Sequence, residues 1–297
     1  MIGVPCIMKI YLMLYMIEGI DLESRDIREI TPDYCLDNLD NPKEALRLDI
    51  LRGKFILNKK LRRIAGSKRL GNLWLVLDPI FTSLVYYFVF TVIRHKSDPE
   101  SVFIGLTYIR MVQMSLKHGY INSIDYSGGI KIERVRTRAL IFSEYFLGIS
   151  NSFFMCLGIS ILFVVFFDIV DPLSILIFYI LGFINYFFWY SAGNLFSPIG
   201  LRIPDTNTLV TYFGLMMFFG SPALYPLSST TGIHRTISLY NPFSFCVEPI
   251  RHLLIGTDDY LLLDPNIGYF YLGFMIITLI YTSFRFDKIR WRISSWS

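Results

Sequence analysis

The chain contains apolar runs that are long enough to cross a lipid bilayer. The clearest is LWLVLDPIFTSLVYYFVFTVI, from Leu73 to Ile93, in which Asp78 is the one charged residue. A hydrocarbon core of about 30 Å needs about 20 helical residues, and this run supplies them. Four further apolar runs follow at Tyr145–Phe167, Leu173–Phe196, Leu209–Leu227 and Ile267–Phe284. Because helices and closed barrels are the structures that span lipid, we expect an all-α integral membrane protein.

The composition supports this class. Hydrophobic residues make up 53% of the chain and charged residues 18%, whereas a soluble domain has about 25% charged residues. The four cysteines and four histidines have no metal-ligand spacing, so we expect no metal site. There is no G-x-x-x-x-G-K-[ST] motif, so we expect no ATPase site and no enzyme activity in this chain. We also expect no cofactor here and no nucleic-acid partner.

Basic residues set the expected topology. The block Arg52–Arg69, the loop Lys131–Arg138 and the tail Arg285–Arg292 are all basic, and basic segments favour the cytoplasmic side. Five spans would place the tail outside. A second span in the weakly apolar stretch 101–121 places all three blocks inside. We therefore predict six transmembrane helices in the cytoplasmic membrane, with both termini cytoplasmic.

The ends of the chain differ from the spans. Residues 18–44 are acidic and interrupted by Pro32 and Pro42, which predicts a poorly ordered, acidic cytoplasmic extension over residues 1–44. Residues 45–72 are basic, with Leu51, Phe55, Leu61 and Ile64 near helical spacing, which is typical of an amphipathic helix in the membrane interface. An ordinary basic flank of the first span is the alternative. We expect the permease domain over 73–284 and a basic cytoplasmic tail over 285–297.

The segment NPFSFCVEPIRHLLIG predicts a short helix before the last span. Asn241 is a good N-cap, Pro242 a good first helical residue and Gly256 a good stop. About 14 residues give about 21 Å, too short to span. Pro249 is expected to kink or split this helix.

Three ionisable residues lie in that segment. Glu248, Arg251 and His252 have the spacing i, i+3 and i+4, on the flank and the face opposite the apolar residues. Two interpretations stand equal. Either this is a re-entrant or interfacial helix whose charges face a wet passage, or it is a surface helix with a solvated face.

Three sequence blocks resemble one membrane-protein family. They are LGNLWLVLDPIFTSLVYYFVF at Leu70–Phe90, GNLFSPIGLRIPDTNTLVTYFGLMMFFGSPALYP at Gly193–Pro226, and the Asn241–Gly256 segment. In this order they resemble the polysaccharide-exporting branch of type-2 ABC transporter permeases. The region after the first span departs from the pattern, with Arg110 where an aromatic is usual and Thr137-Arg138 where a proline is usual.

The resemblance implies a homodimer of six-span subunits around a conduit, with two copies of a separate ATP-binding cassette ATPase on the cytoplasmic face. ATP and Mg would bind that partner. The cargo would be a lipid-linked polysaccharide such as O-antigen, capsule or teichoic acid. Residues 45–65 would form an interface helix, and Asn241, Pro242, Glu248 and Arg251 would belong to an external gate helix. The coupling contact to the ATPase would use Lys131, Glu133, Arg134 and Arg136.

Aromatic residues of the spans have two possible roles. Tyr86, Tyr87, Trp189, Tyr190 and Tyr212 could stack on sugar rings along the conduit or form the interfacial aromatic belt, and for any single one the belt is favoured. Two other functions stay open: a type-2 ABC permease for a drug, lipid or other small molecule, and a membrane-embedded glycosyl- or phosphotransferase. The transferase would need an acidic or histidine-rich site at a cytoplasmic span end, which the sequence does not indicate.

Overall fold

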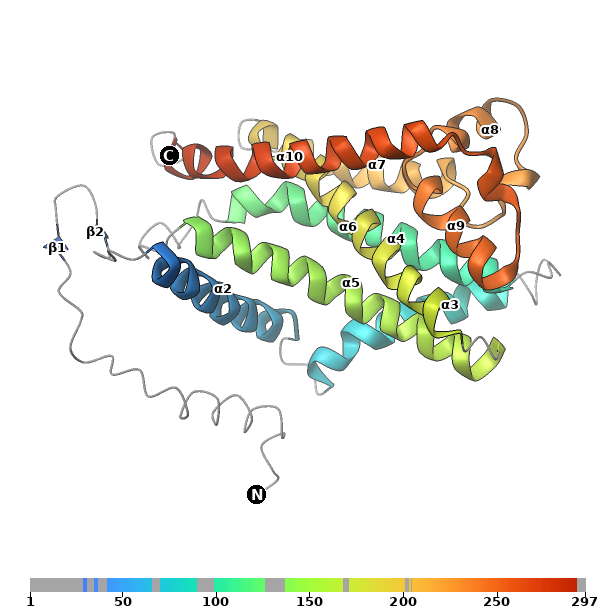
Figure 1. Ribbon diagram of the computed structural model, residues 1–297, viewed down its shortest axis with the longest axis horizontal. Helices are drawn as coiled ribbons and strands as arrows, with labels where there is room; N and C mark the ends of the chain where they lie inside the picture. The colour runs from blue at the N-terminus through green and yellow to red at the C-terminus, as the bar shows by residue number, and fades with distance from the viewer. Residues whose placement is uncertain are drawn as a thin grey trace, which may run out of the picture. The chain divides into compact units, whose positions relative to one another are not determined.

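A computed structural model of the chain describes residues 29–30, 35–36, 42–65, 70–89, 99–125, 137–167, 171–200, 203 and 205–292 (Figure 1). The chain divides into two compact units, Met1–Leu46 and Arg47–Ser297. The first contains β1 (Glu29–Ile30) and β2 (Cys35–Leu36), which pair in antiparallel fashion. The second unit is helical in every element described, so the prediction of an all-α permease domain is confirmed for this part.

The helices follow the order of the predicted segments. They are α2 (Pro42–Ala65), α3 (Trp74–Tyr87), α4 (Pro99–Asp125), α5 (Thr137–Phe167), α6 (Pro172–Gly200), α7 (Thr206–Gly220), α8 (Gly232–Leu239), α9 (Ser244–Ile255) and α10 (Pro265–Arg292). Short 3-10 turns are η1 (Gly71–Leu73), η4 (Leu227–Ser229) and η5 (Asp259–Leu262). Each of the six predicted spans therefore has a helix at its place in the chain.

Three stretches among the described residues are long and apolar enough to cross a membrane. They are Arg138–Val165, Pro172–Gly200 and Pro265–Arg285, in α5, α6 and α10. The helices α3 and α7 have 14 and 15 residues, fewer than the about 20 that a full crossing needs. The chain is thus a helical membrane protein by length and composition, and the count of six spans remains a prediction.

The weakly apolar second segment forms the central helix of the unit. Helix α4 contacts α3, α5, α6, α7 and α9, and it runs beside α6 over much of its length (Figure 1). All residues from Ser101 to Ile109 are buried. This buried stretch is itself apolar, and the weak hydropathy of the segment comes from Arg110, Gln113 and Lys117, which follow it and are not buried.

Glycines allow α4 and α6 to approach closely. A Cβ atom added at Gly119 of α4 would lie 2.1 Å from the carbonyl oxygen of Tyr190 in α6. A Cβ atom at Gly193 of α6 would lie 2.2 Å from the carbonyl oxygen of Leu116 in α4. Both distances are far below van der Waals contact, so larger residues would force the helices apart. Small residues at such positions are typical of helix packing in membranes.

Helix α2 has an apolar side that remains exposed. Leu51 and Phe55 are 42% and 61% exposed, and the ammonium of Lys59 lies 4.9 Å from the Phe55 ring centroid. On another side, a Cβ atom at Gly53 would lie 2.9 Å from Cβ of Phe142 in α5. The predicted helix over 45–65 is therefore confirmed, and its exposed apolar residues suit contact with a lipid interface.

The chain between α7 and α10 contains short helices. Helices α8 and α9 have 8 and 12 residues, about 12 and 18 Å at the standard rise. Neither could cross a bilayer, so the prediction of short helices before the last span is confirmed. Their depth in the membrane remains a prediction.

Candidate functional site

Helix α9 begins two residues later than predicted. Its first α-helical bond runs from the Val247 N–H to the Phe243 carbonyl, at 3.1 Å, so Ser244 is the first helical residue. Pro242 lies in the preceding turn, contrary to its predicted place at the helix start. The Asn241 side chain accepts a hydrogen bond from the Phe243 N–H at 3.0 Å. Asn241 therefore closes the turn that leads into α9 and does not cap the helix itself.

The end of α9 agrees with the prediction. Gly256 has φ 81°, a left-handed conformation that glycine adopts readily, and its N–H donates to the Arg251 and His252 carbonyls at 3.1 and 2.9 Å. Helix α9 continues as one element through Pro249. Of the two expected effects of this proline, a split of the helix in two does not occur, and a kink stays a prediction.

Glu248 and Arg251 form an ion pair that is completely enclosed by protein. Arg251 Nη1 lies 2.7 Å from Glu248 Oε1, and both side chains have no exposed surface. The solvated-surface interpretation is therefore wrong for these two residues. The same burial means that these two charges do not face a wet passage in the protomer either, so that part of the other interpretation is also wrong. The depth of α9 in the membrane stays a prediction.

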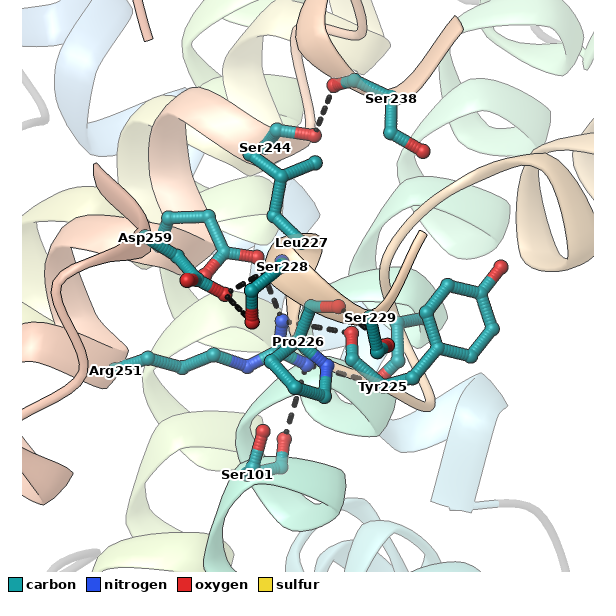
Figure 2. A network of polar contacts seen from close by, with 12 residues as sticks. Ser101, Tyr225, Pro226, Leu227, Ser228, Ser229, Ser238, Ser244, Arg251 and Asp259 are labelled. Carbon is teal, nitrogen blue, oxygen red and sulfur yellow. Dashed lines mark hydrogen bonds and ion pairs between the residues drawn. The ribbon is translucent and has the colours of Figure 1, made fainter. Parts of the chain in front are cut away.

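Arg251 connects α9 to two distant parts of the chain. Nη1 donates to the Tyr225 carbonyl at 3.2 Å, and Nη2 donates to the Ala223 and Ser101 carbonyls at 3.1 and 3.2 Å. Figure 2 shows Arg251 extending from α9 toward Tyr225 and Ser101. One guanidinium thus joins α9, the turn after α7 and the first turn of α4. Such an arrangement uses the planar fork of arginine, which lysine cannot reproduce.

The segment after α9 also contacts the turn after α7. Asp259 accepts hydrogen bonds from the main-chain N–H and the hydroxyl of Ser228, at 2.9 and 3.0 Å (Figure 2). Asp259 is only 9% exposed. Two separate polar contacts therefore hold the 221–229 segment against α9 and η5.

Burial dominates the electrostatics of this ion pair. It raises the pKa of Glu248 above its ordinary value, because the Arg251 guanidinium only partly offsets the loss of water and the nearby Asp259 carboxylate opposes ionisation. Burial also lowers the pKa of Arg251. The pair depends on its mutual contact for stability, since either charge alone would be stranded.

His252 belongs to a different environment. Its side chain is 38% exposed, and Nδ1 lies 2.9 Å from the Thr257 carbonyl oxygen and 3.5 Å from Asp258 Oδ1. Its ring centroid is 4.3 Å from that of Tyr260. Of the three ionisable residues singled out in this helix, His252 is therefore the one that meets solvent.

A second polar cluster joins α2 to the spans. Glu144 of α5 forms an ion pair with Lys60 of α2, and its other oxygen lies 2.6 Å from His118 Nε2 of α4. His118 Nδ1 lies 2.7 Å from the Tyr186 hydroxyl of α6. The Glu144 side chain is 1% exposed. Four helices therefore meet at one buried carboxylate.

Sequence reasoning missed this second cluster. Lys60 and Glu144 are separated by 84 positions, and no local motif links them. The available signal was an acid, Glu144, directly before the apolar run that starts at Tyr145. Sequence reasoning did not single out Asp259 either, because its contact with Ser228 joins positions that are 31 residues apart.

The other predicted site residues are placed as follows. Lys131, Glu133, Arg134 and Arg136 lie outside the described residues, so the coupling assignment stays a prediction. Tyr86 and Tyr87 are in α3, with side chains outside the described part. Trp189 and Tyr190 are 4% and 2% exposed inside the protomer, whereas Tyr212 is 65% exposed. Of the three described aromatics, Tyr212 is therefore the one on the surface, where a role in a conduit or a belt stays open.

Comparison with known proteins finds relatives that match most of the chain. No family model matches the chain. Two curated proteins of Klebsiella pneumoniae, both named O-antigen export system permease protein RfbA, are 22% identical to it over 247 residues. The match covers 80% of this chain and 92% of each relative. It confirms the resemblance to polysaccharide-exporting ABC permeases that the three sequence blocks indicate.

Proposed function

We propose that this chain is the transmembrane permease subunit of an ATP-driven exporter that moves a lipid-linked polysaccharide across the cytoplasmic membrane. The observation that carries the proposal is the similarity to O-antigen export permeases over 92% of their length. The helical order agrees with it, because the three resembling blocks fall on η1 and α3, on α6 to the turn after α7, and on α9.

The energy for transport comes from a partner in this proposal. The sequence has no P-loop, so two copies of a separate ATP-binding cassette ATPase would bind and hydrolyse ATP with Mg. The loop between α4 and α5 would contact that ATPase through Lys131, Glu133, Arg134 and Arg136. Two permease chains would form the conduit. The lipid-linked cargo, the homodimer and the two-to-two stoichiometry are all parts of the proposal.

The two polar clusters have mechanical roles in this proposal. The Lys60–Glu144 ion pair ties α2 to α5, so movement of α2 at the cytoplasmic surface would reach the spans. At the other end of α4, Arg251 ties α9 to Ser101. A shift of α4 would therefore displace α9 as well. Such coupled movement is what a gate needs if its position is to follow the helices of the conduit.

Among the described residues, the candidate site for the transferase alternative is the cluster around Glu144. Both Glu144 oxygens are engaged there, one by Lys60 and one by His118. The carboxylate is also buried, so it is not free to act on a substrate as a base or nucleophile. This arrangement favours a structural role and, with the relatives, the transport function.

Purification of the chain with and without its partner tests the proposal. The chain should be co-expressed with each candidate ATP-binding cassette ATPase of the same cell. We expect a stable complex with ATPase activity and no activity from the chain alone. Robust ATP turnover by the chain, in a preparation shown by mass spectrometry to lack any ATPase, would contradict it. So would failure to associate with any ATP-binding cassette ATPase of the same cell.

A further inference from the structure

Helix α4 carries a polar strip on an otherwise buried surface. Every residue from Ser101 to Met111 is buried except Arg110, which is exposed. Gln113 is half-buried and Lys117 is exposed. These three residues have the spacing i, i+3 and i+7, so they lie on one face of the helix. We call Arg110, Gln113 and Lys117 the α4 strip.

The α4 strip lies between α3 and α7. Arg110 Nη2 donates to the Thr82 hydroxyl of α3 at 3.0 Å, and Gln113 Nε2 lies 3.4 Å from the Gly214 carbonyl oxygen of α7. Both neighbouring helices present exposed apolar side chains. These are Phe81 and Val85 on α3, and Leu209, Tyr212 and Met216 on α7. A basic strip therefore runs along the α4 face that is bordered by two apolar helices.

The position of Arg110 makes lipid an unsuitable neighbour. Arg110 is 11 residues after the start of α4 and 15 before its end, about 17 and 22 Å at the standard rise. In the predicted six-span topology α4 is the second span. An arginine at the centre of a span costs about 2.5–3.5 kcal/mol on insertion scales and almost always faces a cavity or a partner. Among the described residues, its polar contact is Thr82 and no acid pairs with it. This guanidinium is therefore available to an anion that is not part of the protomer.

We infer that the α4 strip lines the conduit and binds anionic groups, phosphate or carboxylate, of the exported polysaccharide. This inference rests on the proposed function and adds the charge of the cargo to it. A guanidinium pairs with either anion through two parallel hydrogen bonds. Lys117 repeats the positive charge about 10 Å further along the helix, which suits a polymer whose anionic groups recur along its length.

Two other occupants would satisfy Arg110. One is a carboxylate of a second copy of the chain, for which the exposed Asp78 of α3 is the candidate. The other is the headgroup of an anionic lipid. Charge complementarity alone does not separate these from the cargo, so the experiment distinguishes all three.

The test measures binding of two labelled oligomers to the purified complex with its ATPase in phosphatidylcholine nanodiscs. One is a hexamer of glycerol phosphate and the other is neutral maltohexaose. We expect the phosphodiester to bind at least about tenfold more tightly than maltohexaose. Arg110→Gln should weaken phosphodiester binding by at least about tenfold, since loss of even one hydrogen bond to a charged group implies that factor. Arg110→Lys should recover only part of the affinity, because an ammonium keeps the charge but not the two parallel hydrogen bonds. Lys117→Gln should cause a smaller loss than Arg110→Gln, and the control Arg285→Gln should have no effect.

Several results would overturn the inference. Equal binding of the two oligomers, or unchanged affinity in Arg110→Gln and Lys117→Gln, would show that the strip does not select anions. Displacement of the phosphodiester by added phosphatidylglycerol would assign the site to lipid. A several-fold gain in affinity on Asp78→Asn would show that the second copy holds Arg110. If only this inference is wrong, the wild-type complex should still export its cargo when ATP is added. If the proposed function is wrong, the wild-type complex should show no ATP-driven export.

Discussion

Replacement of Arg251 by alanine is expected to be among the most destabilising single changes in the chain. Arg251 donates to the Glu248 carboxylate and to three main-chain carbonyls, at 2.7 to 3.2 Å. Removing one partner of a buried ion pair costs about 3–5 kcal/mol, because the other charge is stranded. An exposed i, i+3 pair would contribute only about 0.2–0.5 kcal/mol. The two situations therefore differ about tenfold in the free energy of unfolding.

The raised pKa of Glu248 sets an upper limit on this loss. Once the guanidinium is gone, the buried carboxyl can take up a proton instead of remaining charged. We therefore expect Arg251→Ala to lower the free energy of unfolding by about 3–5 kcal/mol and not by the sum of all four hydrogen bonds. Arg251→Lys should recover little, because one ammonium cannot reach acceptors on three segments.

Unfolding of the purified chain in mixed micelles, titrated with sodium dodecyl sulfate, measures the effect. The set contains Arg251→Ala, Glu248→Ala, the double mutant, and Arg235→Ala as a control at an exposed arginine of α8. The double mutant should lose clearly less than the sum of the two single losses, since the residues are coupled. Export and small-solute leakage at normal expression report the role of α9 as a gate.

Two outcomes would refute this reasoning. A loss below about 1 kcal/mol for Arg251→Ala, no larger than for a typical surface change, would mean that the pair is not enclosed as described. Strict additivity of the two single mutants would mean that Glu248 and Arg251 do not interact. Normal export and no leakage in all three variants, despite reduced stability, would leave α9 as a scaffold and not a gate.

Three further predictions concern other parts of the chain. Glu144→Ala should lower the free energy of unfolding by about 1.5–3 kcal/mol, the range for hydrogen bonds to charged groups. The charge swap Glu144→Lys with Lys60→Glu should restore part of that stability. No recovery in the swapped variant would contradict a direct contact between the two residues. Asp171 accepts two hydrogen bonds from the third residue of α6, which lower its pKa. The stabilising effect of Asp171 should thus be present above the ordinary aspartate pKa and should vanish as the pH falls through the lowered pKa. Asp171→Ala should therefore reduce the melting temperature at pH 7 but not in strong acid. Asp171→Asn should show a smaller reduction at pH 7. In sealed cells, Asp258→Cys should react with an impermeant thiol reagent and Arg292→Cys should not; labelling of the latter would overturn the six-span topology.

Sequence alone was sufficient to predict the features that depend on neighbouring residues, such as a helix end or a long apolar helix. The stop of α9 at Gly256 follows from the glycine that its left-handed conformation favours. The long apolar runs gave α5, α6 and α10, which are long enough to span by themselves. The start of α9 was misplaced by two residues, because the Asn241 side chain closes a turn before the helix instead of capping it.

The features of the site that could not be predicted from sequence depend on contacts between residues far apart in the chain. The burial of Arg251 depends on Ser101, which is 150 positions away, and on Ala223, which is 28 positions away. Spacing placed Glu248 and Arg251 next to each other, but it could not tell a solvated face from an enclosed one. Similarly, hydropathy makes α4 a weak candidate for a span because of Arg110, Gln113 and Lys117, and it could not show that the preceding turns of α4 are buried among other helices.

ATP-driven translocation in a defined system is the most direct test of the central claim. Proteoliposomes should contain the chain and its ATPase, with the ATPase facing outward, and a labelled lipid-linked polysaccharide from the host strain in the outer leaflet. We predict that ATP moves the labelled sugar into the lumen, where an added glycosidase cannot reach it, and that vesicles lacking either subunit show no movement. Equal protection without ATP, or ATP-dependent protection in vesicles that lack this chain, would contradict the assignment as the permease.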